Sequence, residues 1–321
     1  MIEKNELKYR VGALLYSPAL NKKVAASVIC EKFNRPYSLA LCLEDTIADD
    51  SLEFAEKQLY ITLKKLFEAS YKNDFYMPMI FIRVRSIRQL LRVWKKMVYR
   101  SELITGFIFP KYSVENADSY NEVIKQINSE VKKNIYMMPI LESKEIVEYK
   151  TRNTVLSEIK KKIDSVRELV LNVRVGGNDF SNEFAARRHY DETIYDILPI
   201  SQLLGDILTV FSREYVVSGP VWEFFSSDNE EWKYGLQKEL KLDKLNGFIG
   251  KTVIHPKQIS VVNDAFKVSR KDYEDAKEII NWGENGLQVG KSFAGERMNE
   301  VKTHLNWAVK TVTLAKIYGV I

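Results

Sequence analysis

Charged side chains stand where several short apolar runs of this sequence stop. Five successive runs end in such residues, namely Glu44 with Asp45, Arg83 with Arg85, Lys111, Glu142 and Asp179. Any one of them could be an ordinary loop charge. Carboxylates gathered beside cationic side chains, however, form a site that can hold a hard metal cation and an anionic substrate together. The sequence predicts such a site if the ends of these runs meet in space.

Glu142 and Asp179 are the candidate ligands of the cation. Mg2+ commonly takes one or two carboxylates and fills its other positions with water and substrate oxygens. Mg2+ is therefore the expected cofactor, with Mn2+ as the alternative. Gly176 and Gly177 precede Asp179. They are predicted to let the backbone turn tightly and to leave room for a bound substrate.

Eight apolar runs, separated by longer amphipathic segments, must position these side chains. We expect strands at 13–16, 39–43, 79–84, 106–109, 135–141, 169–175, 215–217 and 248–254. Helices are expected at 50–69, 87–99, 115–131, 143–163 and 201–213, where apolar residues recur with helical spacing. This alternation predicts a parallel sheet, and eight strands favour a closed (β/α)8 TIM barrel over a doubly wound open sheet. In such barrels the working residues project from the carboxyl ends of the strands.

The length of 321 residues suits one barrel with an addition at its end. We expect a barrel domain over residues 1–285. Residues 286–321 are expected to form a C-terminal extension or lid of the same unit, with a final helix at 298–316. The composition, 45% hydrophobic and 28% charged, is typical of a soluble globular protein.

Charge, hydropathy and cysteine usage narrow the expected partners. The net charge of +5 comes from basic and acidic residues scattered along the chain, which argues against a nucleic-acid interface. No apolar run approaches the roughly 20 residues of a membrane span, and the N-terminus does not resemble a signal peptide. Cys30 and Cys42 lack metal-site spacing. A reduced, cytoplasmic protein is expected.

The motifs at the run ends, taken in order, resemble the HpcH/HpaI aldolase and citrate lyase beta-subunit family of metal-dependent carbon–carbon lyases. The resemblance covers nearly the whole chain. Its motifs are LED at 43–45, RV at 83–84, PK at 110–111, Glu142, GxxD at 176–179 and GKxxIHPxQI at 250–259. The last motif is the most specific of them.

The resemblance implies a lyase or aldolase that acts on a small carboxylate, a 2-oxo or 3-hydroxy acid that is either free or an acyl thioester, through a metal-stabilised enolate. Glu142 and Asp179 would bind Mg2+, and Arg83 would contact the substrate carbonyl or carboxylate. Glu44 and Asp45 would orient Arg83 and a water on the cation. Two candidates remain for the general base, Asp45 through that water and an acid of the C-terminal lid. The resemblance also implies a homo-oligomer, a trimer or a multiple of it.

The sequence departs from the family pattern in three places. Relatives that use coenzyme A thioesters usually carry Arg-Ser where this chain has Gly12 and Ala13, which argues against coenzyme A recognition. Cys42 replaces the aspartate of the family's DLED motif. Glu300 is the stand-in for the acid of the family's C-terminal MID motif, and hence the lid candidate for the base. The chain resembles a divergent branch, the lyase-like proteins encoded beside tellurite-resistance genes.

Two other functions are weighed against the metal-dependent lyase. Lys111 or Lys251, desolvated at a barrel mouth, could form a Schiff base with a carbonyl substrate, although such chemistry gives no use for paired carboxylates. Lys111 is otherwise expected to bind the substrate. A non-catalytic barrel could instead bind a small anion or serve as a scaffold subunit.

The remaining candidates are a tryptophan and three histidines. Trp222, within the segment Trp-Glu-Phe-Phe, either lines the substrate pocket or packs in the core. His255 precedes a proline and is expected to fix a turn. His189 and His304 have no neighbours at metal-ligand spacing.

Overall fold

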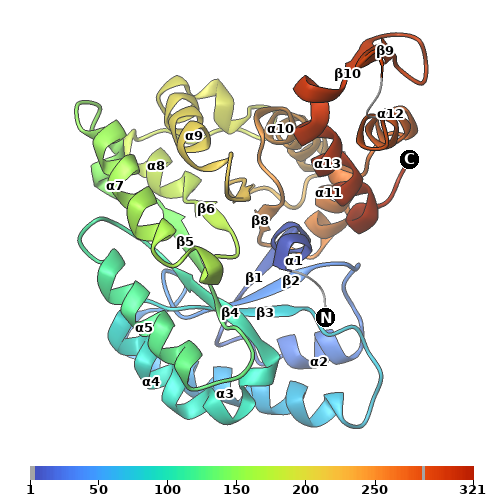
Figure 1. Ribbon diagram of the computed structural model, residues 1–321. Coiled ribbons are helices and arrows are strands. Elements are labelled where there is room, and N and C mark those ends of the chain that lie inside the picture. The colour runs from blue at the N-terminus through green and yellow to red at the C-terminus, as the bar shows by residue number, and fades with distance from the viewer. Residues whose placement is uncertain (1–3, 284–285) are drawn as a thin grey trace.

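Eight parallel strands form a closed barrel in the computed structural model, which describes residues 4–283 and 286–321 (Figure 1). The strands are β1 (Ala13–Pro18), β2 (Ser38–Cys42), β3 (Met79–Arg83), β4 (Ile104–Phe109), β5 (Tyr136–Leu141), β6 (Val173–Val175), β7 (Val217–Ser218) and β8 (Lys251–Val253). Neighbours in sequence pair in parallel from β1 to β7, and β8 pairs with β1. A parallel bridge between Gly219 and Lys251 joins β7 to β8 and completes the ring. The predicted (β/α)8 barrel is confirmed.

Helices surround the barrel, with the first helix packed through Leu7 against the interior cluster at one end and the others around the sides and the mouth. They are α1 (Lys4–Arg10), α2 (Val24–Ile29), α3 (Leu52–Ser70), α4 (Ile87–Met97), α5 (Ala117–Ser129), α6 (Lys144–Val147), α7 (Arg152–Asp164), α8 (Gly177–Glu183), α9 (Leu198–Phe211), α10 (Glu231–Asn246) and α11 (Lys257–Phe266), with short 3-10 turns at Asp49–Ser51, Val98–Leu103, Arg167–Leu169 and Ile194–Asp196. The sequence predicted one helix over 143–163, whereas the chain breaks it into α6 and α7. Among the described residues, no helix has the length and apolar character needed to cross a membrane.

Helix α4 illustrates why these segments fold as they do. The Ser86 side chain accepts a hydrogen bond from the backbone N–H of Gln89 and so caps the first turn. Leu90, Val93 and Met97 are buried at helical spacing against the barrel. The apolar stripe therefore fixes which face of the helix meets the sheet.

The alternation of side chains along each strand divides the core into two parts. One set, including Leu15 and Ile82, points outward and packs under the helices. The other set, including Leu14, Phe81 and Met138, fills the barrel interior. Above this interior set, nearer the carboxyl ends of the strands, the inward positions become polar. That change from apolar to polar layers creates the floor of the functional site.

The C-terminal segment differs from its predicted form. After α12 (Arg270–Ile280) come a two-stranded antiparallel hairpin, β9 (Val289–Lys291) and β10 (Met298–Glu300), and then α13 (Val301–Tyr318). The helix predicted to start at 298 thus starts three residues later, because 298–300 pairs with β9. Helix α13 packs on α12, α11 and α1, and the Tyr318 hydroxyl donates to the carbonyl of Tyr9 at 2.7 Å. The domain boundary proposed at 285 falls on residues 284–285, outside the described residues.

Candidate active site

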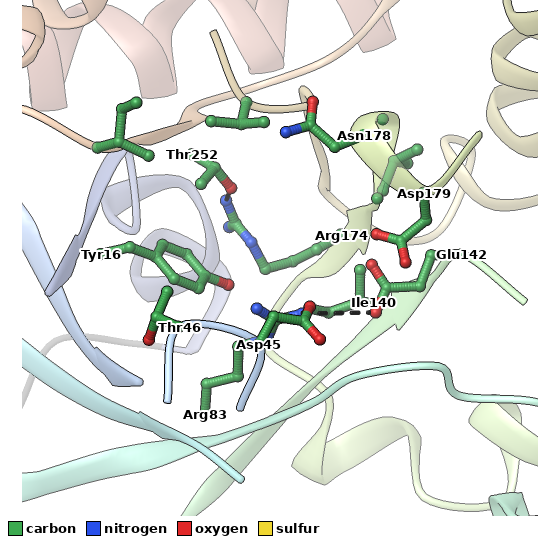
Figure 2. Close-up of a pocket in the computed structure, with 15 residues that line it drawn as sticks. Tyr16, Asp45, Thr46, Arg83, Ile140, Glu142, Arg174, Asn178, Asp179 and Thr252 are labelled. Atoms are coloured by element: carbon green, nitrogen blue, oxygen red, sulfur yellow. Dashed lines mark hydrogen bonds and ion pairs between the residues drawn. The ribbon is translucent and has the colours of Figure 1, made fainter. Parts of the chain in front are cut away.

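A cavity of about 240 Å3 opens at the carboxyl ends of the strands. Its lining comes from seven strands or the loops that follow them, and includes Tyr16, Asp45, Arg83, Glu142, Arg174 and Asp179 (Figure 2). The barrel therefore brings together charged residues that are far apart in the sequence. At roughly 30 Å3 per water in the liquid, the volume corresponds to about eight waters, which suits a small organic acid.

Arg83 contacts three carboxylates and lies at the centre of the charged cluster. Its Nη2 lies 2.8 Å from Glu44 Oε2, 3.2 Å from Asp45 Oδ2 and 3.7 Å from Glu142 Oε1. Burial of the guanidinium opposes its charge, but Tyr16 and the surrounding carboxylates outweigh burial and raise the pKa of Arg83. Its Nε has no hydrogen-bond partner among the described residues. Arg83 is thus a permanently charged group with a donor left for a ligand.

Glu44 and Asp45 are adjacent carboxylates that differ in burial and in the direction of their pKa shifts. Burial raises the pKa of Glu44, whose Oε2 also accepts the backbone N–H of Asp45 at 2.8 Å. Partial burial opposes ionisation of Asp45, yet its hydrogen bond with Glu44 and the charges of Arg83 and Lys111 lower its pKa overall. Half of the Asp45 side chain is exposed, at 52%. Asp45 is therefore the ionised, reachable carboxylate, and Glu44 is the buried group behind it.

Arg85 holds the loop that carries this pair. Its Nη2 donates to the carbonyl oxygens of Glu44 and Ile47, and its Nη1 pairs with Asp49. The strand-end arginine next to Arg83 thus supports the β2 loop and does not line the cavity.

Glu142 is buried at the end of β5, and its pKa is strongly perturbed. Desolvation and the nearby charge of Asp179 raise the pKa of Glu142 to about 8, against the opposing effect of Arg83. Its Oε1 accepts the backbone N–H of Lys111 at 2.9 Å. Lys111 has a positive φ of 49°, a conformation that is uncommon outside glycine and that presents this N–H to the carboxylate.

Gly176 and Gly177 make room for protein atoms. A Cβ on Gly176 would lie 2.0 Å from Glu142 Oε2, and a Cβ on Gly177 would lie 2.6 Å from Pro220 Cβ. Neither glycine has a positive φ, and both lie at the start of α8. They line the cavity, but the space that they leave is filled by Glu142 and Pro220. The close approach of Glu142 and Pro220 is therefore the reason why these two positions require glycine.

Asp179 stands in the first turn of α8 and faces Glu142. Figure 2 shows the two carboxylates side by side at one end of the cavity. A buried carboxylate whose pKa is raised by a second carboxylate is suited to a cation between them. Among the described residues no group of three or more acidic, histidine or cysteine side chains is arranged to hold a metal. A cation here would take its remaining oxygens from water and substrate.

The two lysines differ in position. Lys111 Nζ lies 3.5 Å from Glu44 Oε1, and its pKa is raised by the neighbouring carboxylates despite partial burial. Its side chain lies on the rim behind Asp45, in a neighbouring pocket. Lys251 points outward from β8, is fully buried, and lies 2.8 Å from Glu239 and 2.7 Å from Asp243. The raised pKa keeps Lys111 charged, and neither lysine lines the cavity.

Two other candidates, Trp222 and Glu300, lie away from the cavity. Trp222 is fully buried, its Nε1 donates to the carbonyl of Trp232, and its ring packs against Gly235. It therefore belongs to the core, and the neighbouring Val221 lines the cavity. Glu300 lies in β10, on the hairpin at the outer edge of the molecule, and does not line the cavity of its own chain (Figure 1).

The histidines take part in local structure. His255 Nδ1 accepts the backbone N–H of Lys257 at 3.2 Å, and its ring stacks on Phe225. The amide of Gln258 fixes the same turn by accepting the N–H groups of residues 254 and 255. His304 accepts the N–H of Glu300 at the start of α13.

Sequence reasoning missed Arg174. This arginine of β6 is 1% exposed and projects into the cavity between Tyr16 and Thr252 (Figure 2). A signal existed, because Asn172 and Arg174 interrupt the apolar run 169–175 at a spacing of two. That spacing places both on the inner face of the strand.

The site and fold define a class, a TIM barrel whose mouth presents paired carboxylates and buried arginines. Within that class, the chain belongs to the family of carbon–carbon bond lyases of the TIM-barrel fold, whose model matches residues 5–320. The predicted citrate lyase beta-like family is confirmed. Citrate lyase subunit beta of Haemophilus influenzae is 42% identical over 57 residues, which is 18% of this chain and 19% of that protein.

Solved structures resemble the whole fold at low identity. CitE of Mycobacterium tuberculosis, in complex with magnesium, acetoacetate and coenzyme A, aligns with a TM-score of 0.61 at 18% identity, covering 96% of this chain and 99% of that one. RipC of Yersinia pestis aligns with a TM-score of 0.54 at 15% identity, covering 81% and 96%. These likenesses support the barrel itself.

Proposed function

We propose that this protein is a Mg2+-dependent carbon–carbon lyase or aldolase that acts on a small 2-oxo or 3-hydroxy carboxylic acid. The observation that carries the proposal is the placing of Glu142 and Asp179 side by side in a cavity with Arg83. Neighbouring folds have been solved with magnesium and small carboxylates, among them CitE of Mycobacterium tuberculosis with oxaloacetate. The family of the chain agrees with that chemistry.

Glu142 and Asp179 are the residues that would hold the cation, with Mn2+ as the alternative to Mg2+. When bound, the cation would act as a Lewis acid toward the substrate oxygens on which negative charge develops. The chain supplies the rest of the electrostatic stabilisation. Arg83 is held in place by three carboxylates and keeps its Nε free to donate toward the same developing charge.

Asp45 is the general base that we propose for the cleavage direction. It would take the proton of the substrate hydroxyl, the C–O bond would become a carbonyl, and the electron pair of the broken C–C bond would form the enolate of the leaving fragment. Asp45 suits this role because it lines the cavity with half of its side chain exposed. Its lowered pKa keeps it in the ionised form that can accept a proton, although the same shift makes it a weaker base. Glu44, buried behind it with a raised pKa, would orient Arg83 and Asp45.

The Schiff-base alternative is disfavoured by both lysines. A nucleophilic lysine needs a lowered pKa, whereas the pKa of Lys111 is raised. Lys251 is sealed between Glu239 and Asp243 on the outer side of β8. Lys111 instead supports the site through its backbone contact to Glu142 and its proximity to Glu44. A scaffold without catalysis would give no reason for a buried glutamate beside a second carboxylate.

A coenzyme A thioester is not part of the proposal. CitE of Mycobacterium tuberculosis has been solved with coenzyme A. In this chain Gly12 stands where thioester-using relatives carry arginine, and a Cβ there would lie 2.9 Å from the Tyr318 hydroxyl. Free carboxylic acids are therefore the proposed substrates.

A homo-oligomer, trimeric or a multiple of it, remains part of the proposal. In support, large apolar side chains are exposed on the C-terminal hairpin and α13, including Phe293, Met298, Leu305 and Val309. Exposed apolar surface of this kind commonly marks a contact between proteins.

A thermal-shift panel tests the function directly. We expect Mg2+ or Mn2+ to raise the Tm of the protein, and a 2-oxo acid to raise it further only when the metal is present. The response to metal should vanish in Glu142→Gln. No response of the wild type to either metal would favour the non-catalytic barrel.

A further inference from the structure

Arg174 is a buried cation without a partner of opposite charge. The residue is 1% exposed, yet no carboxylate of the described residues lies within ion-pair distance of its guanidinium. Its Nη2 donates to Thr252 Oγ1 at 2.6 Å, while Nε and Nη1 have no hydrogen-bond partner in the described part of the chain. Burial lowers the pKa of Arg174, and Tyr16 acts against that effect. A buried arginine normally finds a carboxylate, because an uncompensated charge is costly away from water.

The unpaired guanidinium lies inside the cavity of the site. Figure 2 shows it beside Tyr16 and Thr252, pointing away from Asp179 and Glu142. Register explains the position: Arg174 pairs with Ile140 on one side and with Ser218 on the other, so neither neighbouring strand offers it a carboxylate at the same height. Arg83, in contrast, is surrounded by Glu44, Asp45 and Glu142.

We propose that Arg174, together with Tyr16 and Thr252, forms a second anion subsite, which selects substrates that carry a second carboxylate. This inference rests on the proposed function, in which the first carboxylate lies near Glu142, Asp179 and Arg83. One guanidinium with two hydroxyl groups beside it matches one carboxylate. A phosphate dianion would call for further cationic donors, and the other arginine of the lining, Arg83, is already paired with carboxylates.

Calorimetric titration of paired ligands tests the subsite. Pyruvate and oxaloacetate share a 2-oxo acid end and differ by one carboxylate, and phosphonopyruvate replaces that carboxylate by a phosphonate. In excess Mg2+ we expect the wild type to bind oxaloacetate at least about thirtyfold more tightly than pyruvate, a preference set by one buried charge-assisted contact. Arg174→Met should reduce the preference to less than about threefold while leaving pyruvate affinity nearly unchanged. Arg174→Lys should give an intermediate value. Arg35→Met, at an exposed arginine outside this cavity, is the charge-matched control and should keep the wild-type preference.

Ligand-free stability provides a second, independent measurement. Since Arg174 has no compensating carboxylate, Arg174→Met should leave the Tm unchanged or raise it, whereas a fall of more than about 3 °C would mean that the arginine is a structural group. The subsite is also overturned if Arg174→Met keeps the oxaloacetate preference, or if phosphonopyruvate binds more tightly than oxaloacetate. Failure of every 2-oxo acid to bind the wild type in Mg2+ would instead overturn the proposed function, together with the inference built on it. Equal binding of pyruvate and oxaloacetate would overturn the second subsite alone.

Discussion

At the scale of single residues, the site contains two kinds of charged group, the carboxylates that would bind the cation and the arginine that would stabilise negative charge on the substrate. Glu142 and Asp179 provide oxygen ligands, and Arg83 provides a fixed positive charge whose position is set by three carboxylates. A conservative substitution can change the charge of a side chain and keep its shape, or keep the charge and change the hydrogen-bonding geometry. Such variants therefore test the two roles one at a time.

Glu142→Gln and Asp179→Asn should each abolish divalent-cation binding and leave the fold intact. Each change removes the charge of an oxygen ligand and keeps the shape of the side chain. Calorimetry with Mg2+ and Mn2+ measures the loss, and circular dichroism checks the fold. The ligand assignment fails if both variants retain the affinity of the wild type.

Arg83→Lys should bind the ligand almost normally and turn over far more slowly. Lysine keeps one positive charge but loses the planar fork of donors, and the charge that Arg83 stabilises is largest in the transition state. We expect turnover to fall about a hundredfold, which corresponds to roughly 3 kcal/mol of selective stabilisation. Steady-state kinetics on a substrate found by screening 2-oxo and 3-hydroxy acids gives both quantities. Lost affinity with unchanged turnover would make Arg83 a substrate clamp.

At the scale of elements, the close approach of α8 to β5 sets the position of the carboxylate pair. Helix α8 starts at Gly177 directly after β6, and the backbone at Gly176 lies against the Glu142 side chain. A side chain at Gly176 and the observed position of Glu142 cannot coexist.

Gly176→Ala should therefore reduce cation affinity without touching a ligand. The new Cβ would lie 2.0 Å from Glu142 Oε2, so the carboxylate must leave the N–H of Lys111. We expect a loss of at least about tenfold in affinity and a lowered Tm, as for overpacking in a filled site. Gly205→Ala in α9 is the matched control, because nothing lies within 4 Å of its added Cβ. The control should be neutral or slightly stabilising, and equal behaviour of the two variants would contradict the packing argument.

At the scale of the whole molecule, the charge of Glu142 links folding, pH and metal binding. Its pKa in the folded protein is about 8, above the value of 4.5 for an unperturbed glutamate. Between these values the folded state binds more protons than the unfolded state. This group therefore lowers stability as pH rises through that window.

Without metal, the wild type should lose stability relative to Glu142→Gln between pH 5 and pH 9. The variant carries no titrating group at this position, so the difference isolates Glu142. Urea unfolding in the presence of a chelator measures it. With Mg2+ present, affinity should rise with pH up to about 8 and proton release should accompany binding, because the carboxylate must ionise to act as a ligand. A pH-independent difference between wild type and variant would show that Glu142 is already ionised in the metal-free fold.

The barrel fold and most of the charged residues of the site can be predicted from the sequence alone. Apolar runs alternating with amphipathic helices predict the barrel, since side-chain periodicity and the parallel connection are local properties. The rule that barrel strands end at one mouth predicts that the charged residues at the strand ends meet. In the structure Asp45, Arg83, Glu142 and Asp179 line one cavity and Glu44 pairs with Arg83, whereas Arg85 and Lys111 lie outside the lining of that cavity. The position of a residue at the end of a strand is enough to place it near the barrel mouth, because this inference requires no knowledge of strand register.

Only the tertiary structure decided which partners each side chain has. The sequence allows Trp222 to line the pocket or to pack in the core, and its packing on Gly235 places it in the core. Lys251 points outward to Glu239 and Asp243, while its neighbour Thr252 points inward to Arg174. Arg174 looks like an interruption of an apolar run until the registers of β5, β6 and β7 show that no carboxylate meets it. The physical reason is that local periodicity sets the face of a strand, whereas the partners at one height of the barrel come from segments distant in sequence and depend on strand stagger.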